Sequence, residues 1–243
     1  MSRPFLTARW TDLFLATYAV PRAILEPRLP PGLALDLRAG QAFVSLVAFN
    51  FLDTCVLGIP WPGYRNFAEL NLRFYVRAGQ DRGVMFVREF VPQKLVAWVA
   101  RTLYNEPYLS APLSTQVSQG PDTISVEYRL AYARRTHMLR ATGKKPAVDC
   151  AETSTEHFFK EHRWGYGVTR HGESIRYEVV HPIWAMYPVQ DYEVDVDWAT
   201  VYGPQWGFLK TQAPLSTILA VGSAVQVYPK GKLPMPQMAT GKL

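Results

Sequence analysis

Polar and apolar residues alternate without interruption from Glu69 to Arg77. Because successive side chains of a β-strand point to opposite faces, Glu69, Asn71 and Arg73 should share one face of a strand. A carboxylate, an amide and a guanidinium in one row could hold a small polar ligand at three points, with the planar guanidinium matching a carboxylate or a phosphate. The same alternation is typical of an antiparallel strand with one face in water. The row is therefore a binding site if it points into a cavity, and an ordinary solvated face if it does not.

Length and composition indicate a folded globular protein. The 243 residues are 48% apolar and 19% charged, and a chain of this length can bury roughly 70–75% of its unfolded surface. No stretch is both highly charged and poor in aromatic residues, which is the composition of disordered segments. We expect a single domain over residues 1–228 and a loose C-terminal tail, rich in Pro, Lys and Gly, over residues 229–243.

The formal net charge of +6 comes from basic residues scattered along the chain. Local pairs occur at Arg134–Arg135 and Lys144–Lys145, but no basic stripe is present. Nucleic-acid binding normally needs Lys and Arg clustered on one face, so we expect a solvated basic surface and no nucleic-acid partner. The excess of arginine would also suit an anionic small molecule, in keeping with Arg73.

Cysteine usage and the N-terminal residues indicate a soluble, cytoplasmic protein. Cys55 and Cys150 match no zinc or redox spacing and suggest reduced, structural thiols. Arg9 and Asp12 interrupt the apolar run near the N-terminus, which argues against a secretory signal. The longest nearly apolar segment, residues 42–52, is much shorter than the roughly 20 residues of a membrane helix. We therefore expect no membrane partner, and the sequence leaves homo-oligomer formation open.

The order of the expected elements indicates an α+β fold that is mainly antiparallel β. β-Branched and aromatic residues between turn signals predict strands at residues 11–20, 41–51, 69–77, 82–90, 123–132, 166–170, 174–181, 184–194 and 215–227. A turn at Arg38–Gly40 is expected to join residues 33–37 to 41–51 in a hairpin. Short helices are expected at residues 22–29, 93–104 and 151–161. This pattern favours one continuous antiparallel sheet system, with a closed barrel as one form of it, over a doubly wound parallel sheet.

The helix expected at residues 93–104 is amphipathic. Steps of three and four residues, the spacing of one helix face, separate Leu95, Trp98, Val99, Thr102 and Leu103, most of which are apolar. Lys94 is expected on the solvent side of this helix.

Other groupings of reactive residue types predict neither a cofactor nor a metal centre. His157 and His162 lie five residues apart and turn to different sides of a helix, so a shared metal would need other ligands. The run Gly165–Gly167 lacks the third glycine and the strand-to-helix context of a dinucleotide loop, and no serine lies in Gly-x-Ser-x-Gly. Aromatic residues crowd the segment 184–206. Core packing explains most of them, and an aromatic wall for a planar ligand is the alternative.

Three segments in the first third of the chain carry a family resemblance. They read Leu-Pro-Pro-Gly-Leu-Ala-Leu-Asp at residues 29–36, Ala-Phe-Val-Ser-Leu-Val at residues 42–47 and Phe-x-Glu-x-Asn-x-Arg-x-Tyr at residues 67–75. On these motifs the chain resembles, from Trp10 to about Val227, an uncharacterised bacterial family that is remotely related to acetoacetate decarboxylase. The resemblance implies a β-rich barrel or cone with a central cavity, and it favours an inward-pointing polar row. It places Glu69 where the decarboxylases have one pocket glutamate, and Ser45 where they have a second.

The resemblance also bears on catalysis. Acetoacetate decarboxylases carry a Gly-Arg-Glu motif that is followed by an aromatic residue, Pro and two lysines, one of which forms a Schiff base. The matching run, residues 100–109, keeps the spacing from Arg101 to Pro107 but has Tyr108 and Leu109 at the lysine positions. Because this position supplies no amine nucleophile, we expect no Schiff-base decarboxylase activity. The expected cavity wall includes Glu69, Asn71, Arg73 and Arg101.

Three functions are compatible with such a cavity. The first is binding of a small, anionic organic molecule through Arg73 and its neighbours. The second is a lyase or hydratase that acts on a keto acid or an enol, with Glu69 and Tyr108 as catalytic residues for proton transfer. The third is a non-catalytic scaffold or regulatory partner whose cavity is simply core. Burial would raise the pKa of Glu69 and the charge of Arg73 would lower it, and the sequence does not decide between these effects.

Overall fold

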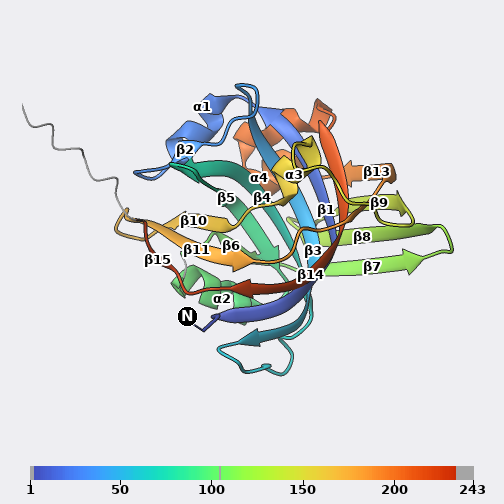
Figure 1. Cartoon of the computed structure of the whole chain (residues 1–243), viewed down its shortest axis with the longest axis horizontal. Coiled ribbons are helices and arrows are strands. Elements are labelled where there is room, and N and C mark those ends of the chain that lie inside the picture. The colour runs from blue at the N-terminus through green and yellow to red at the C-terminus, as the bar shows by residue number, and fades with distance from the viewer. Residues whose placement is uncertain (1–2, 104, 234–243) are drawn as a thin grey trace, which may run out of the picture.

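The computed structural model describes residues 3–103 and 105–233. Its strands form two sheets (Figure 1). The larger sheet contains β1 (Leu6–Val20), β2 (Ala34–Leu35), β3 (Ala42–Val56), β4 (Phe67–Ala78), β5 (Asp81–Val91), β6 (Tyr108–Ser110), β10 (Trp164–Val168), β11 (Ser174–Val180), β12 (Met186–Tyr187), β14 (Ser216–Val227) and β15 (Gly231–Lys232). The smaller sheet contains β7 (Leu113–Gln119), β8 (Thr123–Tyr132), β9 (Arg135–Lys144) and β13 (Val189–Asp195). The helices are α1 (Arg22–Leu25), α2 (Lys94–Leu103), α3 (Thr155–Lys160) and α4 (Trp198–Tyr202), with 3-10 turns at Glu26–Arg28 and Pro204–Thr211.

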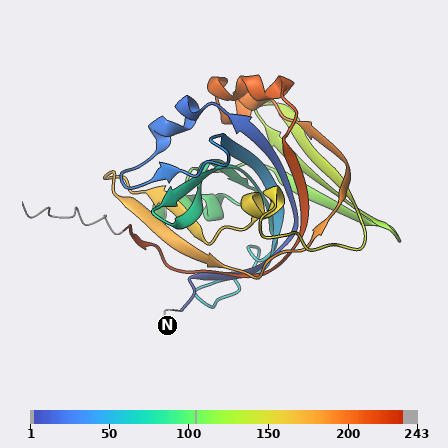
Figure 2. The same ribbon diagram turned by 45° about the horizontal axis from the view of Figure 1, so that its top comes forward.

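The main strands of the larger sheet follow one another in a ring. Their order is β14, β1, β3, β4, β5, β10 and β11, and β11 pairs in turn with β14 through Val179↔Val227 and Val180↔Gln226. Figure 2 shows these strands curving around the interior of the molecule. Neighbours in the ring are antiparallel except β5 and β10, which are parallel. The predicted class, an α+β fold that is mainly antiparallel β with a few short helices, is confirmed.

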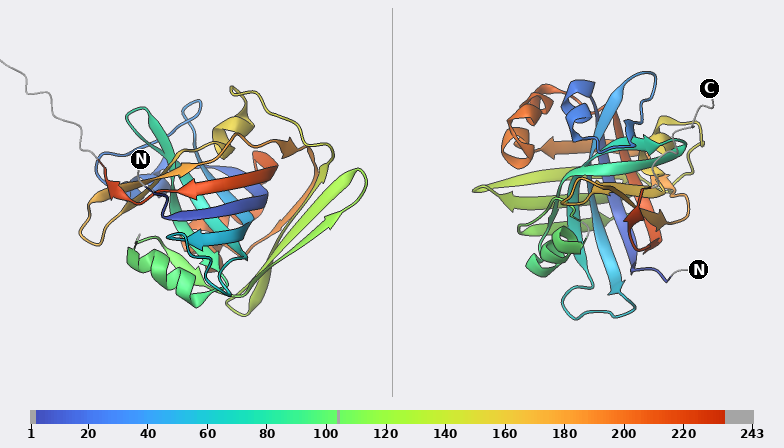
Figure 3. Two further views of the ribbon diagram at one scale, coloured as in Figure 1. Left: turned by 60° about the horizontal axis from the view of Figure 1, so that its bottom comes forward. Right: turned by 90° about the vertical axis from the view of Figure 1, so that its left-hand side faces the viewer.

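The ring is covered on its outer side, which is why its first strands are apolar on both faces. Phe14 and Tyr18 of β1 belong to the core that also contains Tyr128 of the smaller sheet and Trp198 of α4. Leu13, one residue before Phe14, belongs to a second core inside the ring. Figure 3 shows the smaller sheet set against the larger one. Alternate residues of each ring strand therefore face either this outer core or the interior.

Two expectations about strands are corrected. Residues 34–35 do not form a hairpin with the strand that follows them, because β2 pairs with β4 through Leu35↔Val76. The sequence also predicted no strand over β9. The buried positions of β9 include His137, Ala141 and Gly143, whose side chains are polar or small, so the strand lacks the apolar alternation that would have marked it.

The apolar face of the helix α2 also differs from the prediction. Leu95 and Trp98 are 47% and 57% exposed, whereas Ala97 is buried. Val96 and Val99 line an internal cavity together with Leu95. Of the predicted apolar face, Leu95 and Val99 thus line the cavity, whereas Trp98 is exposed. Tyr104, at the end of the predicted helix, lies outside the described residues.

A short strand lies within the predicted C-terminal tail. The tail was predicted to be loose from residue 229, but Gly231–Lys232 form β15, which pairs with β11. Residues 234–243 lie outside the described part of the chain. Cys55 and Cys150 are free and half-buried. None of the helices in the described ranges has the length and the apolar character needed to cross a bilayer.

Candidate functional site

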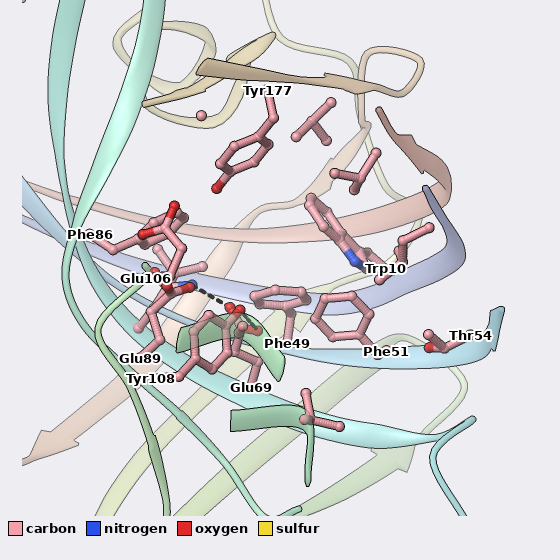
Figure 4. Close-up of a pocket in the computed structure, with 18 of the residues that line it drawn as sticks. Trp10, Phe49, Phe51, Thr54, Glu69, Phe86, Glu89, Glu106, Tyr108 and Tyr177 are labelled. Atoms are coloured by element: carbon pink, nitrogen blue, oxygen red, sulfur yellow. Dashed lines mark hydrogen bonds between the residues drawn. The ribbon is translucent and has the colours of Figure 1, made fainter. Parts of the chain in front are cut away.

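A cavity of about 460 Å³ lies within the ring of strands. Most of its wall is apolar, with Trp10 and Leu13 from β1, Val47, Phe49 and Phe51 from β3, Val84 and Phe86 from β5, and Val96 and Val99 from α2. The polar part of the wall that includes Glu69 is formed by Asn71, Glu89, Glu106, Tyr108 and Tyr177. In Figure 4 the three glutamates and Tyr108 gather on one side, while Trp10, Phe51 and Thr54 lie toward the other. The cavity thus combines one polar patch with an extensive aromatic wall, as ligand sites commonly do.

The polar side chains of β4 face the interior of the ring. Leu70, Leu72 and Phe74 pack in the outer core, so the residues between them must face the interior. Glu69, Asn71 and Arg73 accordingly line the cavity. Tyr75, the next member of the row, is buried with its hydroxyl against Ser45 and the carbonyl oxygen of Phe159. The structure therefore places the polar row in the cavity, as the site hypothesis requires.

Strand pairing brings further polar residues beside Asn71. Asn71 lies opposite Glu89 in the pairing of β4 with β5, and Glu89 lies opposite Tyr108 in the pairing of β5 with β6. Directly paired residues of neighbouring strands project from the same face of a sheet. Asn71, Glu89 and Tyr108 thus form a row that crosses three strands.

A β-bulge in β5 is what turns Glu89 toward the cavity. Leu72 pairs with Arg88 whereas Arg73 pairs with Phe86, so Val87 is an extra residue in the ladder. A regular strand would place Phe86 and Glu89, which are three residues apart, on opposite faces. The bulge changes this phase, and both side chains line the cavity.

Glu106 and Tyr177 reach the same place from other elements. Asn105 has a left-handed backbone (φ 54°), and its Nδ2 donates to the carbonyl oxygen of Val168 at 2.6 Å, which anchors the segment that carries Glu106. Tyr177 lies opposite Gly165 in the pairing of β11 with β10. A side chain at Gly165 would collide with the Tyr177 ring. Glycine is therefore needed for the ring to lie across β10 with its hydroxyl toward the cavity (Figure 4).

Glu69 is held by several hydrogen-bond donors. The hydroxyl of Tyr108 donates to its Oε2 at 2.7 Å, and the Nδ2 of Asn71 donates to its Oε1 at 2.9 Å. A hydrogen bond with Glu89 lowers the pKa of Glu69 and raises that of Glu89, so Glu89 is the member of this pair that keeps the proton. Glu69 is consequently the member of this pair that ionises more readily.

Burial controls the protonation of all three glutamates, which we call the carboxyl cluster (Glu69, Glu89 and Glu106). It raises the pKa of Glu69 to about 7, although the hydrogen bonds and the charge of Arg73 act in the opposite direction. It raises the pKa of Glu89 well above its usual value, and the charges of Glu69 and Glu106 add to this increase. It raises the pKa of Glu106 to about 8 against a hydrogen bond from Tyr177. The cluster therefore holds protons at neutral pH.

Tyr108 keeps its proton as well. Burial and the negative charges of Glu69 and Glu89 raise its pKa well above the usual value. Its hydroxyl is therefore a permanent donor next to a carboxyl group that titrates near neutrality. This combination can move a proton and can stabilise a developing negative charge.

Cationic and imidazole groups line a different part of the wall. Arg73 donates from Nη2 to the carbonyl oxygen of Phe159 at 2.8 Å, and its Nε is buried without a partner. The fully buried side chain of Lys160 pairs with Glu161 at 2.5 Å. His162 has a pKa well below its usual value because of burial and the charge of Arg73, so its ring is neutral.

The structure assembles most of the predicted site but not all of it. Glu69, Asn71, Arg73 and Tyr108 all line the cavity. Arg101, in contrast, is exposed on α2 and is not part of the wall. Leu109 packs against the outer core, and Ser45 is buried against Thr17 and Tyr75.

Sequence reasoning missed Glu89, Glu106 and Lys160. Glu89 follows the bulge, which breaks the alternation, and Glu106 lies in an irregular segment. The sequence signal for Glu89 was an acid next to Phe90 and Val91 near the end of a strand in which Arg88 is the neighbouring charged residue. Among the described residues, no group of three or more His, Cys, Asp or Glu side chains is arranged to hold a metal ion.

Solved structures of acetoacetate decarboxylase-like proteins share this fold. An acetoacetate decarboxylase-like enzyme from Sphingomonas wittichii RW1 has a TM-score of 0.66 and 13% identity over 95% of this chain and 94% of that one. The acetoacetate decarboxylase of Legionella pneumophila has a TM-score of 0.63 and 12% identity over 96% and 88% of the two chains. The enduracididine biosynthesis enzyme MppR, complexed with pyruvate, has a TM-score of 0.64 and 12% identity over 97% and 92%. The predicted relationship to acetoacetate decarboxylase-like proteins is thereby confirmed at the level of fold.

At the level of sequence, the chain is similar to proteins that are themselves uncharacterised. The protein YqjF of Bacillus subtilis (strain 168) is 33% identical over 108 residues, which are 44% of this chain and 45% of that protein. A family model described as an uncharacterised conserved protein matches residues 7–223. This range contains the carboxyl cluster, Tyr108 and nearly all of the strand ring, and on that match the chain belongs to the DUF2071 family.

Proposed function

We propose that this protein binds a small organic molecule in the cavity and that Glu69, together with Tyr108, transfers a proton to or from it without a Schiff base. The observation that carries the proposal is the state of Glu69. It is a buried carboxyl group with a pKa of about 7, bonded to a tyrosine hydroxyl on the wall of a mainly aromatic cavity. A general acid or base is most effective when its pKa lies near the working pH.

The chemistry that suits this pair is proton transfer next to a carbonyl group, as in a lyase or hydratase that acts on a keto acid or an enol. In the resting site Tyr108 donates to the Glu69 carboxylate. When Glu69 accepts a proton from the carbon of a ligand, that hydrogen bond loses its charged acceptor and weakens. The Tyr108 hydroxyl is then free to turn and donate to the enolate oxygen that forms in the same step.

The absence of Schiff-base chemistry is part of the proposal. On the family resemblance, Tyr108 stands at the position of the decarboxylase lysine and supplies no amine. Of the cavity-lining residues, Lys160 does carry an amine, and its Nζ is bonded to Glu161 within an ion pair. Glu161 also accepts from the backbone N–H of Trp184 at 3.2 Å, so the ion pair supports a structural role for Lys160 at the end of α3.

One observation favours a second candidate, the binding of an organic anion. Arg73 lines the cavity with a buried Nε that has no partner, although its Nη2 is used by Phe159. A guanidinium with an unpaired N–H donor in a mainly apolar cavity is suited to a carboxylate. The two candidates are compatible, because a keto acid would present its carbonyl to Glu69 and its carboxylate to Arg73.

The proton-transfer proposal is tested by hydrogen exchange in D₂O. The methyl protons of pyruvate and the methylene protons of phenylpyruvate are followed by NMR with the wild-type protein and with Glu69→Gln. We expect exchange above the uncatalysed rate, increasing as the pH rises through about 7, and a loss of roughly 100-fold or more in the variant, because general base catalysis contributes about 10²–10⁴. Glu152→Gln, a matched change at an exposed residue, should exchange like the wild type.

Two results would contradict the proposal. Equal exchange rates for folded Glu69→Gln and wild type, or no catalysed exchange of either keto acid by the wild type, would remove Glu69 from this role. Reduction with borohydride in the presence of the keto acids should leave the protein mass unchanged. A stable adduct on Lys160 would show that Schiff-base chemistry operates from another element.

A further inference from the structure

Three hydrogen-bond acceptors of the carboxyl cluster and its neighbour Asn71 have no partner in the protein. They are Asn71 Oδ1, Glu89 Oε1 and Glu106 Oε1, and all three atoms are buried. Their residues are 2%, 1% and 7% exposed and line the same cavity. Buried polar atoms without a partner are rare and costly in folded proteins, so a group of three at one place calls for an explanation.

The neighbouring hydrogen bonds fix Asn71 Oδ1 and Glu89 Oε1 as acceptors, and Glu106 Oε1 becomes an acceptor when Glu106 is ionised. Asn71 uses its Nδ2 to donate to Glu69, so its carbonyl oxygen is the atom left without a partner whatever the protonation of the glutamates. Glu89 gives its proton to the bond with Glu69, so its remaining oxygen accepts. Glu106 interacts with the Tyr177 hydroxyl and still has Oε1 unused. The missing partner is therefore a donor with several N–H or O–H groups.

The charges around the cluster favour a cationic donor. Arg73 acts on Glu69 and Lys230 acts on Glu106, yet burial still prevails over both in setting the protonation of these carboxyl groups. The carboxyl groups therefore hold protons, and a cation bound beside them would favour their ionised form. Phe49, Phe86 and Tyr177 lie around the glutamates (Figure 4), and aromatic faces attract cations.

We propose that the carboxyl cluster and Asn71 bind a protonated nitrogen group of the ligand, such as an amidinium or an ammonium. The unused oxygens of Glu89, Glu106 and Asn71 accept its N–H bonds, and the aromatic wall receives the adjoining apolar body. This inference deepens the proposed function and rests on it only in placing the ligand in the same cavity. A ligand that also carries a carboxylate for Arg73 would be amphoteric.

Three planar isosteres test the proposal, because they differ mainly in charge and in donors. Benzamidine is a cation with a fork of N–H donors, benzamide is neutral, and benzoate is an anion. Their affinities for the whole protein are measured by isothermal titration calorimetry at pH 8. We expect benzamidine to bind at least about tenfold more tightly than the neutral benzamide, since charge-assisted hydrogen bonds are worth one to two powers of ten in affinity. Benzoate can bind at Arg73 instead, so its affinity should not change in variants of the carboxyl cluster.

Proton release gives a second readout of the same contact. A bound cation stabilises the ionised carboxyl groups, so below pH 7 benzamidine must displace protons from the cluster. Titrations at pH 6.5 in two buffers with different ionisation enthalpies should show release of protons for benzamidine and none for benzamide. The titratable groups around the bound cation are Glu69, Glu89, Glu106, Tyr108 and Tyr177, with Arg73 acting on Glu69 and Lys230 on Glu106. Both tyrosines keep their protons over this range because burial raises their pKa values.

Two charge-neutralising variants locate the site. Glu89→Gln and Glu106→Gln each keep the side-chain shape, and each should lower benzamidine affinity about tenfold or more while leaving benzamide within about twofold. Glu152→Gln is the matched control at an exposed position. Circular dichroism confirms the fold of every variant.

The proposal is overturned if benzamide binds as tightly as benzamidine, if benzamidine does not bind at millimolar concentration, or if both variants bind it like the wild type. These outcomes are separable from a failure of the proposed function. Keto-acid exchange that depends on Glu69 would stand without benzamidine binding, and benzamidine binding that depends on Glu89 and Glu106 would stand without exchange.

Discussion

At the level of single residues, burial outweighs the charge of Arg73 in setting the state of Glu69. The side chain is 3% exposed, and even three donors and a nearby guanidinium leave its pKa raised to about 7. A carboxyl group in this state carries both acid and base capacity near neutral pH. The competition that the sequence left open is thus decided by the depth of the site.

The role of Arg73 can be isolated by comparison with Arg101, the other arginine predicted for the wall. Arg73→Ala should weaken the binding of phenylpyruvate by roughly 1.5–3 kcal/mol, the usual cost of a lost hydrogen bond to a charged group. Arg101→Ala, at an exposed position on α2, should bind it like the wild type. The measurement is isothermal titration calorimetry at pH 7. Equal losses in the two variants would indicate a general effect of net charge and would contradict a direct contact at Arg73.

Sequence reasoning located the site residues that lie on a regular strand. Glu69, Asn71 and Arg73 follow a strict period of two, so one decision about the direction of the row places all three. Tyr108 required the family resemblance, because a three-residue strand has too short a pattern to read. Glu106 was beyond reach, since its position depends on the left-handed backbone of Asn105 and a contact with Val168 that is 63 residues away.

At the level of elements, the site depends on close contact between β10 and β11. Gly165 has an ordinary backbone conformation, so its importance comes from the space that the Tyr177 ring occupies above it. The ring in turn directs a hydroxyl at Glu106. A glycine in a strand interior often marks such a close approach.

Gly165→Ala should therefore destabilise the protein by about 1–3 kcal/mol or more, the usual cost of overpacking. Chemical denaturation measures the free energy of unfolding. The double variant Gly165→Ala with Tyr177→Leu removes the ring and should recover part of the loss. Gly231→Ala, where nothing lies within 4 Å of the added methyl group, is the control. A loss at Gly165 that is unchanged by Tyr177→Leu would show that the ring is not the cause.

The elements that the sequence missed share a physical reason. Pattern reasoning detects strands through large apolar side chains at every second position. In β9 the buried positions include a histidine, an alanine and a glycine, and in β5 the bulge at Val87 shifts the phase before Glu89. Both features are set by partners in the sheet, which the local sequence does not contain.

At the level of the whole molecule, the ring and its outer cover explain how three acids can be buried at all. The apolar residues of β1, β3 and β4 form one core outside the ring and a second inside it. These cores supply the stability that offsets the cost of desolvating the carboxyl groups. The fold class could be inferred from the sequence because turn signals and alternation recur along the chain, whereas ring closure depends on the pairing of β11 with β14.

The buried acids should make the stability of the protein depend on pH in a defined direction. Glu106 has a pKa raised from 4.5 to about 8, so between these values the folded state holds a proton that the unfolded state has lost. Its stabilising contribution is present below pH 4.5 and is lost as the pH rises through about 8. At about 1.4 kcal/mol per pKa unit, the free energy of unfolding should fall by roughly 3–4 kcal/mol from pH 5 to pH 8 on account of this residue.

Comparison with Glu106→Gln isolates this contribution from other titrating groups. His162, whose pKa is lowered by burial, favours the folded state increasingly as the pH rises through its unfolded value, and so opposes the trend. The difference between wild type and variant cancels His162, because both proteins contain it. Urea denaturation at pH 5, 6.5 and 8 should show the glutamine variant gaining stability relative to wild type at each step, while Glu152→Gln follows the wild type throughout. Parallel curves for wild type and Glu106→Gln would mean that Glu106 is solvated and ionised in the folded protein, and the carboxyl cluster would then lack the protons on which its chemistry depends.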